Sequence, residues 1–143
     1  MIRACVMGSP VSHSLSPKLH GFWLKQYKID GEYTRREVTP ENLKKELKIL
    51  AEQGFAGCNL TLPLKECALA LMDELDESSR VSGAVNTVVI HDGKMTGYNS
   101  DGFGFMESLK AQYPAWDGTN VVILGAGGAA RGIAAALNKA GVK

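Results

Sequence analysis

The sequence predicts an α/β protein with a mixed, mostly parallel sheet and helices on both faces, followed by one further strand-helix unit. Short apolar runs alternate with amphipathic segments, which is typical of parallel strands joined by crossover helices. Two strand-like runs flank His91-Asp-Gly93, a hairpin signature that makes part of the sheet antiparallel. A last apolar run leads directly into a glycine loop and an alanine-rich helix.

The first third of the chain predicts two strands and two helices. Residues 2–7 form an apolar strand, and Ser16 before a proline predicts a helix with Ser16 as its N-cap. Residues 33–38 contain arginines and predict a strand with an exposed face or edge. A second helix begins at 39–41 and ends at Gly54. Apolar residues recur at helical spacing in both helices: Leu19, Phe22, Trp23 and Tyr27, then Leu43, Leu47 and Leu50.

The rest of the chain completes the sheet and begins a second unit. Pro63 ends a third strand over 54–62, because proline lacks the N–H that a ladder needs. A break after the helix that follows Asp101 predicts one domain over 1–114 and another over 115–143. A short helix is expected over 64–72, a charged helical turn or loop over 73–82, and hairpin strands at 84–90 and 94–98. The helix that follows Asp101 is expected to direct four side chains inward: Phe105, Met106, Leu109 and Tyr113. A buried strand is expected at 120–124.

Composition excludes several classes of function. The 143 residues suit about one domain, and a net charge of +1 gives no electrostatic case for binding nucleic acid or an anionic membrane. No apolar run approaches the roughly 20 residues of a membrane span, and the first residues lack a secretory signal pattern. Three cysteines (Cys5, Cys58, Cys67) in apolar settings without C-x-x-C spacing predict buried, reduced thiols. The three histidines have no metal-ligand spacing. We expect a cytoplasmic protein without a metal.

The glycine loop from Gly125 to Arg131 has the context of a dinucleotide-binding Rossmann fingerprint, between a buried strand and a helix. Gly125 permits the tight turn, Gly127 allows a pyrophosphate to approach, and Ala130 is the third small residue. The alternative is a strand-to-helix turn that needs small residues only for packing. The residue that reads the ribose is expected about 20 positions later, so the sequence predicts only the first piece of a cofactor domain.

Polar residues gather where the predicted strands end. Asn59 and Thr61 point the same way on a strand, and Lys65 falls near a helix N-terminus, whose field disfavours a cation. Such a lysine is either a solvated surface residue or one held to transfer a proton. Ser14 beside the cap could complete a small-carboxylate site. The other candidates, Asn86 and Asp101, are either turn residues or part of the same cleft.

Five motifs in order resemble the shikimate dehydrogenase family. They are Gly8-x-Pro-x-x-His-Ser-x-Ser-Pro17 with His20, Asn59-x-Thr-x-Pro-x-Lys65, Gly83-Ala-Val-Asn-Thr87, Gly97-x-Asn-x-Asp101 and Gly125-Ala-Gly-Gly-Ala129, and they span nearly the whole chain. The resemblance implies a substrate-binding domain followed by an NADP-binding Rossmann domain, with the active site between them. It also implies NADPH-dependent reduction of 3-dehydroshikimate to shikimate, on the way to chorismate and the aromatic amino acids.

The resemblance also implies roles for individual residues. Ser14 and Ser16 would bind the substrate carboxylate, and Lys65 would be the catalytic acid/base, paired with Asp101. The ring hydroxyls would be held by Thr61, Asn86 and Asp101, with Asn59 lining the pocket. The cofactor would contact Gly125, Ala126, Gly127, Gly128 and Ala129, and Glu77 matches a position near the cofactor in some members.

The sequence departs from the family pattern mainly in length, since the rest of the cofactor domain and a later substrate-binding glutamine are absent. Ser100 stands where threonine is common, and Leu60, Leu62 and Leu64 where valine, isoleucine or phenylalanine are common. We expect an inactive fragment of a shikimate dehydrogenase that can form a homodimer. The alternatives are a quinate/shikimate dehydrogenase that uses NAD, a non-catalytic shikimate-binding module, and a structural or regulatory fragment.

Overall fold

Six strands form one sheet in the computed structural model, which describes residues 1–118 and 120–142. The strands are β1 (Ile2–Gly8), β2 (Gly31–Glu37), β3 (Gly57–Leu60), β4 (Glu74–Leu75), β5 (Thr87–His91) and β6 (Lys94–Tyr98). Their order in the sheet is β2-β1-β3-β5-β6-β4. β1 pairs in parallel with β2 and β3, and β4 with β6, whereas β5 is antiparallel to β3 and β6. The predicted mixed sheet and its hairpin are confirmed.

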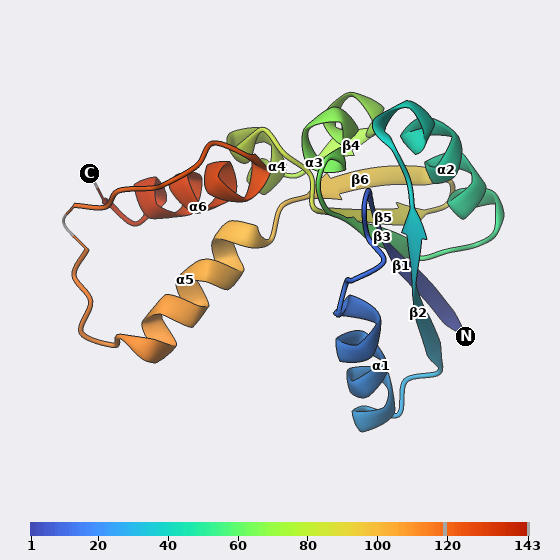
Figure 1. Ribbon diagram of the computed structural model, residues 1–143, viewed down its shortest axis with the longest axis horizontal. Coiled ribbons are helices and arrows are strands. Elements are labelled where there is room, and N and C mark those ends of the chain that lie inside the picture. The colour runs from blue at the N-terminus through green and yellow to red at the C-terminus, as the bar shows by residue number, and fades with distance from the viewer. Residues whose placement is uncertain (119, 143) are drawn as a thin grey trace.

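Helices lie on both faces of this sheet, as predicted (Figure 1). They are α1 (Ser16–Gln26), α2 (Pro40–Glu52), α3 (Leu64–Cys67) with the 3₁₀ turn η1 (Ala68–Leu71), α4 (Glu77–Ser82), α5 (Asp101–Gln112) and α6 (Gly128–Lys139). In Figure 1, α1 lies below the sheet and α2 and α3 above it. α5 and α6 extend away to one side and pack against each other, and α6 also contacts α4.

The hydrophobic core lies between the sheet and α2. The predicted stripe of Leu43, Leu47 and Leu50 is fully buried, as expected from its helical spacing. Burying each leucine stabilises the fold by roughly 1.5–3 kcal/mol. The other side chains of this core come from three central strands and from α3: Cys5, Met7, Cys58, Leu60, Val88 and Leu64. The predicted burial of the cysteines is confirmed for Cys5 and Cys58 and wrong for Cys67, which is exposed.

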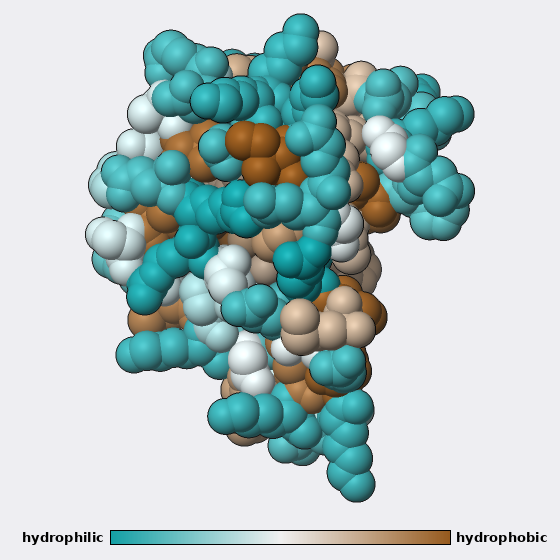
Figure 2. Space-filling model, turned by 90° about the vertical axis from the view of Figure 1, so that its right-hand side faces the viewer, coloured by the Kyte–Doolittle hydropathy of each residue, from teal (hydrophilic) through white to brown (hydrophobic). Residues whose placement is uncertain are grey.

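The apolar stripe of the first helix, α1, is not the side that packs on the sheet. Trp23 and Phe22 are 42% and 60% exposed, and Leu19 and Tyr27 are also exposed. The side of α1 turned inward carries His20 and Leu24 instead, one helical turn apart. On this side the His20 ring stacks on the flat face of the Tyr33 ring of β2. Figure 2 shows brown hydrophobic patches among hydrophilic side chains in its lower half, which is the part of the molecule where α1 lies in Figure 1.

The predicted strand at 120–124 is also wrong, although the helix after it is present as α6. Val122 and Leu124 are 86% and 95% exposed. A buried parallel strand is stable only between neighbouring strands, and none of the strands in the described ranges pairs with this segment. The boundary between the two predicted domains therefore stays a prediction.

The linking helix α5 follows the prediction only in part. Phe105 and Tyr113 are exposed rather than directed inward, while Met106 and Leu109 are half-buried. α5 projects beyond the sheet and packs closely on α6 at one point, where a Cβ on Gly102 would collide with the Gly132 carbonyl oxygen.

The other predicted boundaries shift by a few residues. The helix expected over 64–72 is α3 followed by η1, and the charged segment 73–82 holds β4 and α4. The first hairpin strand begins at Thr87, because residues 84–86 are held by hydrogen bonds to Lys65 and Tyr98 outside the ladder. Among the described residues no helix combines the length and the apolar character that crossing a membrane requires.

Candidate active site

Backbone hydrogen bonds bring the polar ends of several strands together. The amide N–H of Leu60 donates to the Asn86 carbonyl over 2.8 Å, and the Asn86 N–H donates to the Tyr98 carbonyl over 2.9 Å. The Val85 N–H donates to the Lys65 carbonyl over 2.7 Å. These bonds fix the end of β3, the start of α3 and the segment before β5 against the end of β6. The segments that carry the predicted site residues therefore meet at one edge of the sheet.

Lys65 and Asp101 form an ion pair at this edge. The Lys65 Nζ lies 2.7 Å from Asp101 Oδ2, and the two side chains are 14% and 22% exposed. Lys65 lies in the first turn of α3, as predicted, and Asp101 begins α5, where the helix N-terminus favours a carboxylate. Because the pair is largely shielded from water, its attraction exceeds that of a surface pair. An ammonium held in one position is a candidate acid for a bound ligand.

Asn86 holds the other oxygen of the same carboxylate. Its Nδ2 donates to Asp101 Oδ1 over 2.8 Å, and its Oδ1 accepts the Ser100 backbone N–H over 3.0 Å. The side chain is also in hydrogen-bond contact with the hydroxyls of Thr87 and Ser100. Each oxygen of Asp101 thus has one polar partner, and the carboxylate is fixed between the amide and the ammonium.

Asn59 lies beneath this cluster and uses its amide within the protein. Its Oδ1 accepts the Tyr33 hydroxyl over 2.7 Å. Its Nδ2 donates to the Asn86 carbonyl over 3.3 Å and to Thr87 Oγ1 over 3.0 Å. The predicted contact between Asn59 and a substrate stays a prediction, and these bonds favour a supporting role.

Gly8 at the end of β1 lets the serine-rich loop pass directly beside Thr61. A Cβ on Gly8 would collide with the Thr61 side chain and would lie 2.9 Å from the Leu62 carbonyl oxygen. The Ser9 N–H donates to that carbonyl over 3.1 Å, and the Thr61 N–H donates to the Met7 carbonyl over 2.9 Å. This close approach of two backbones places the start of the loop against the end of β3.

Leu15 is the N-cap of α1, so the predicted Ser16 cap is wrong. Ser16 already belongs to the helix, and its backbone N–H donates to Ser14 Oγ over 3.3 Å. A turn causes this difference, because the Ser14 N–H bonds to the Val11 carbonyl over 3.0 Å and brings the hydroxyl back toward the helix. Both predicted carboxylate-binding serines therefore lie at the N-terminus of α1, where free N–H groups favour an anion.

Two side chains of β2 reach the site although no sequence motif marks them. Arg35 donates to the carbonyl oxygens of Ser12 and Ser14, so its positive charge lies beside the serine-rich loop. Tyr33 reaches Asn59. Their spacing of two on a strand predicts one shared face. That this face borders the site follows only from the pairing of β2 with β1.

The glycine loop begins α6 directly beside Lys65. Gly127 is the N-cap of α6, and no side chain caps this end of the helix. A Cβ on Gly128 would lie 3.1 Å from the Lys65 Cβ and 3.2 Å from the Ala84 Cβ. On the outer side, a Cβ on Gly125 or Gly127 would meet no atom within 4 Å. The loop thus offers uncapped helix N–H groups and open space, which fit the phosphates of a dinucleotide.

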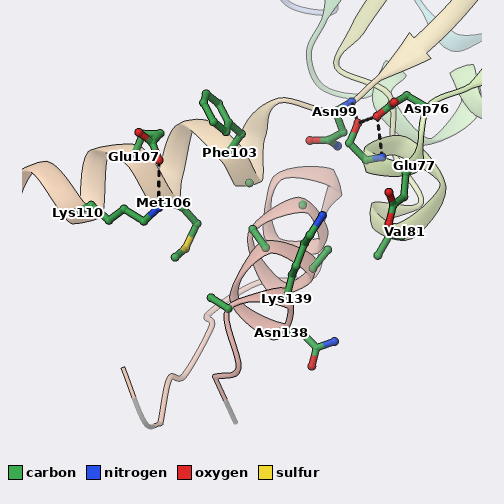
Figure 3. A pocket seen from close by; sticks show the side chains of 16 residues that line it. Asp76, Glu77, Val81, Asn99, Phe103, Met106, Glu107, Lys110, Asn138 and Lys139 are labelled. Carbon is green, nitrogen blue, oxygen red and sulfur yellow. Dashed lines mark hydrogen bonds and ion pairs between the residues drawn. The ribbon is translucent and has the colours of Figure 1, made fainter. Parts of the chain in front are cut away.

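Glu77 lies away from the ion pair, at the first position of α4. It lines a hollow of about 700 Å³ between α4, α5 and α6, together with Asn99 and Met106 (Figure 3). This hollow contains neither Lys65 nor the serine-rich loop. The predicted role of Glu77 near a cofactor stays a prediction, supported by its position opposite α6.

His20 stacks on Tyr33 with ring centroids 4.0 Å apart and meets Trp23 edge to face. Burial lowers the pKa of His20 from its usual value. In the unfolded chain His20 takes up a proton at about pH 6.5, whereas in the folded chain it does so only at a lower pH. We therefore expect the free energy of unfolding to fall as the pH decreases from about 6.5 through the lowered pKa. Urea unfolding of the unchanged protein and of His20→Phe between pH 7.5 and 5 measures this, and parallel curves would contradict it.

Comparison with known proteins gives consistent findings. The model of the shikimate dehydrogenase substrate binding domain matches residues 6–88. The shikimate dehydrogenase (NADP(+)) of Rhodospirillum rubrum is 52% identical over 141 residues, which are 96% of this chain and 50% of that protein. The enzyme of the same name from Paramagnetospirillum magneticum is 50% identical over 142 residues, 97% of this chain and 51% of that protein. The chain spans about half the length of these curated relatives.

Solved structures agree with these relatives. Shikimate 5-dehydrogenase from Thermus thermophilus, in complex with NADP(H) and shikimate, is 45% identical with a TM-score of 0.93. The match covers 99% of this chain and 54% of that one. The ligand-free 5-ketofructose reductase of a Gluconobacter species is 37% identical with a TM-score of 0.88, over 99% of this chain and 50% of that one.

Proposed function

The chain belongs to the shikimate dehydrogenase substrate-binding domain family, and on this basis we propose that it is the substrate-binding half of a shikimate dehydrogenase. The proposed reaction is the NADPH-dependent reduction of 3-dehydroshikimate to shikimate, in the pathway to chorismate and the aromatic amino acids. The observation that supports it best is the shielded Lys65–Asp101 pair, which lies directly beside Gly128 of the glycine loop.

The polar groups at the sheet edge suit the two ends of such a substrate. Ser14 and Ser16 bind the carboxylate at the α1 N-terminus, and the Arg35 charge next to this loop favours the anion. Thr61, Asn86 and Asp101 hold the ring hydroxyls. A ring held at both ends presents one carbon to the glycine-loop side of the site.

Lys65 acts as the acid in reduction and as the base in the reverse direction. Its ammonium donates a proton to the ketone oxygen of the substrate and takes it back when shikimate is oxidised. Asp101 holds the ammonium in place over 2.7 Å and compensates its charge. NADPH, when bound, supplies the hydride, and the residues that would hold its phosphates are Gly125 to Ala129 at the start of α6.

Two alternatives differ in cofactor and in catalysis. Preference for NAD or NADP depends on a ribose-binding residue expected about 20 positions after the glycine loop. The curated relatives are named for NADP(+), which supports NADP. A non-catalytic module would bind shikimate through the same residues and would show no turnover even with a complete cofactor domain. A cytoplasmic location and a homodimer stay predictions.

Isothermal titration of the chain with shikimate tests the proposed substrate. We expect saturable binding, and we expect Ser14→Ala and Ser16→Ala each to weaken it about tenfold or more, because a hydrogen bond to a charged group contributes about 1.5–3 kcal/mol. The control Ser108→Ala changes an exposed serine on α5 and leaves the affinity unchanged.

The methyl ester of shikimate gives a second control, because it keeps the ring hydroxyls and lacks the negative charge. We expect it to bind the unchanged protein more weakly than shikimate and to be affected little by the two serine changes. Equal affinity for acid and ester would contradict the assigned carboxylate site. No binding of either compound would contradict the proposed substrate.

A further inference from the structure

A one-directional chain of side-chain hydrogen bonds connects β2 with the ion pair, and we name its members Tyr33, Asn59, Thr87, Asn86 and Asp101 the polar chain. The Tyr33 hydroxyl donates to Asn59 Oδ1 over 2.7 Å, and Asn59 Nδ2 donates to Thr87 Oγ1 over 3.0 Å. The Thr87 hydroxyl donates to Asn86 Oδ1 over 2.9 Å, and Asn86 Nδ2 donates to Asp101 Oδ1 over 2.8 Å. Each of the four other members thus donates toward the Asp101 carboxylate.

Backbone groups that can only donate or only accept hydrogen bonds determine the direction of the polar chain. The Ser100 backbone N–H can only donate, so it requires Asn86 to present its oxygen there and its NH₂ to the carboxylate. The Asn86 carbonyl can only accept, so it requires the Asn59 NH₂ on its side. The Asn59 oxygen is then left facing Tyr33, whose hydroxyl must donate.

Packing and burial hold Tyr33 as a donor at the far end of the chain. The His20 ring stacks on it at an interplanar angle of 7°. Burial raises the pKa of Tyr33 above its usual value, so the hydroxyl keeps its proton at neutral pH. Hydrogen bonds that follow one another in this way polarise and strengthen each other in a shielded environment.

We propose that Tyr33 is a positioning residue for Asp101, acting through the polar chain. Its hydroxyl donates the hydrogen bond that the Asn59 side-chain oxygen accepts. The Asn59 NH₂ group in turn holds the Asn86 backbone carbonyl and the Thr87 hydroxyl in place. That amide then keeps the Asp101 carboxylate aligned with the Lys65 ammonium. The relevance of this alignment to a substrate rests on the proposed function, whereas the coupling itself does not.

The coupling is tested in the unliganded chain by ¹H–¹⁵N NMR of side-chain amides. Tyr33→Phe removes the hydroxyl and keeps the ring, so a changed signal reports the hydrogen bond rather than the ring current. We expect the NH₂ signals of both Asn59 and Asn86 to shift. Tyr27→Phe, which changes an exposed tyrosine of the same ring type, leaves them in place. If only the Asn59 signal shifts, the coupling stops there and the proposal fails.

The effect on a ligand is tested with a double-mutant cycle on shikimate affinity, measured by NMR titration. We expect Tyr33→Phe alone to raise the Kd about fivefold, the value of one net hydrogen bond. In an Asn86→Ala background the same change should alter the Kd less than about twofold, because the chain is already broken. Equal effects in both backgrounds would mean a merely structural role.

The two measurements separate two kinds of failure. Shifted Asn86 signals in a protein that does not bind shikimate would contradict the proposed function and leave the coupling intact. Shikimate binding with unshifted Asn86 signals would overturn the positioning role of Tyr33 and leave the proposed function intact.

Discussion

Replacing Lys65 by alanine is expected to lower kcat by about 10²- to 10⁴-fold with little change in KM, because only the proton transfer is lost. The assay needs a complete cofactor domain, so the chain is joined to the second half of the Rhodospirillum rubrum relative, which is 52% identical over the shared part. Reduction of 3-dehydroshikimate is followed through the absorbance of NADPH.

Lys44→Ala is the matched control for this prediction. Lys44 is an exposed lysine on α2, so its loss removes the same charge without touching the site. The control should keep kcat within about twofold of the unchanged enzyme. A fall of less than about tenfold for Lys65→Ala, or a rise in KM alone, would contradict the acid/base role.

Replacing Asp101 by asparagine is expected to reduce the free energy of unfolding by about 3 kcal/mol. The change leaves the Lys65 ammonium, whose side chain is only 14% exposed, without its negative partner. It also replaces the charged carboxylate that accepts the hydrogen bond of the Asn86 NH₂ group by a neutral amide. Urea unfolding of the 143-residue chain followed by circular dichroism measures the loss without any enzymatic assay.

A surface pair on the same helix as Asp101, α5, provides the comparison. Lys110 and Glu107 lie 3.2 Å apart with side chains 65% and 54% exposed. Glu107→Gln should cost no more than about 1 kcal/mol, because water and salt already screen this pair. Equal losses for Asp101→Asn and Glu107→Gln would mean that the Lys65–Asp101 pair is not electrostatically shielded.

A double variant distinguishes a lost interaction from a stranded charge. In Lys65→Met with Asp101→Leu both charges are gone, so no ammonium is left without a partner. We expect this variant to recover most of the stability that Asp101→Asn loses, because replacing a whole buried pair by apolar side chains is often neutral. The same variant should have no turnover.

Local patterns predicted much of the fold. The spacing of Leu43, Leu47 and Leu50 indicates which face of α2 is buried, and Pro63 marks where α3 begins. The His91-Asp-Gly93 turn predicts the hairpin. Each of these signals acts through neighbouring residues and needs no partner far along the chain, which is why it can be recognised in the sequence.

The candidate site could be predicted only in part. The resemblance to the shikimate dehydrogenase family implied that Lys65 pairs with Asp101, and the structure shows the two charged groups 2.7 Å apart. Arg35 and Tyr33 carry no motif, and they reach the site because β2 pairs with β1 at one edge of the sheet. Strand pairing between distant segments has no local sequence signal, so these two contacts were not predictable.

The sequence by itself thus determined the helices and strands with strong local patterns and the family to which the domain belongs. Only the tertiary structure decided which face of α1 packs inward and whether residues 120–124 form a strand. An apolar stripe or run shows that a segment can be buried. Whether it is buried depends on a surface formed by other segments. Here the inward side of α1 meets the Tyr33 ring through His20, and none of the described strands pairs with 120–124.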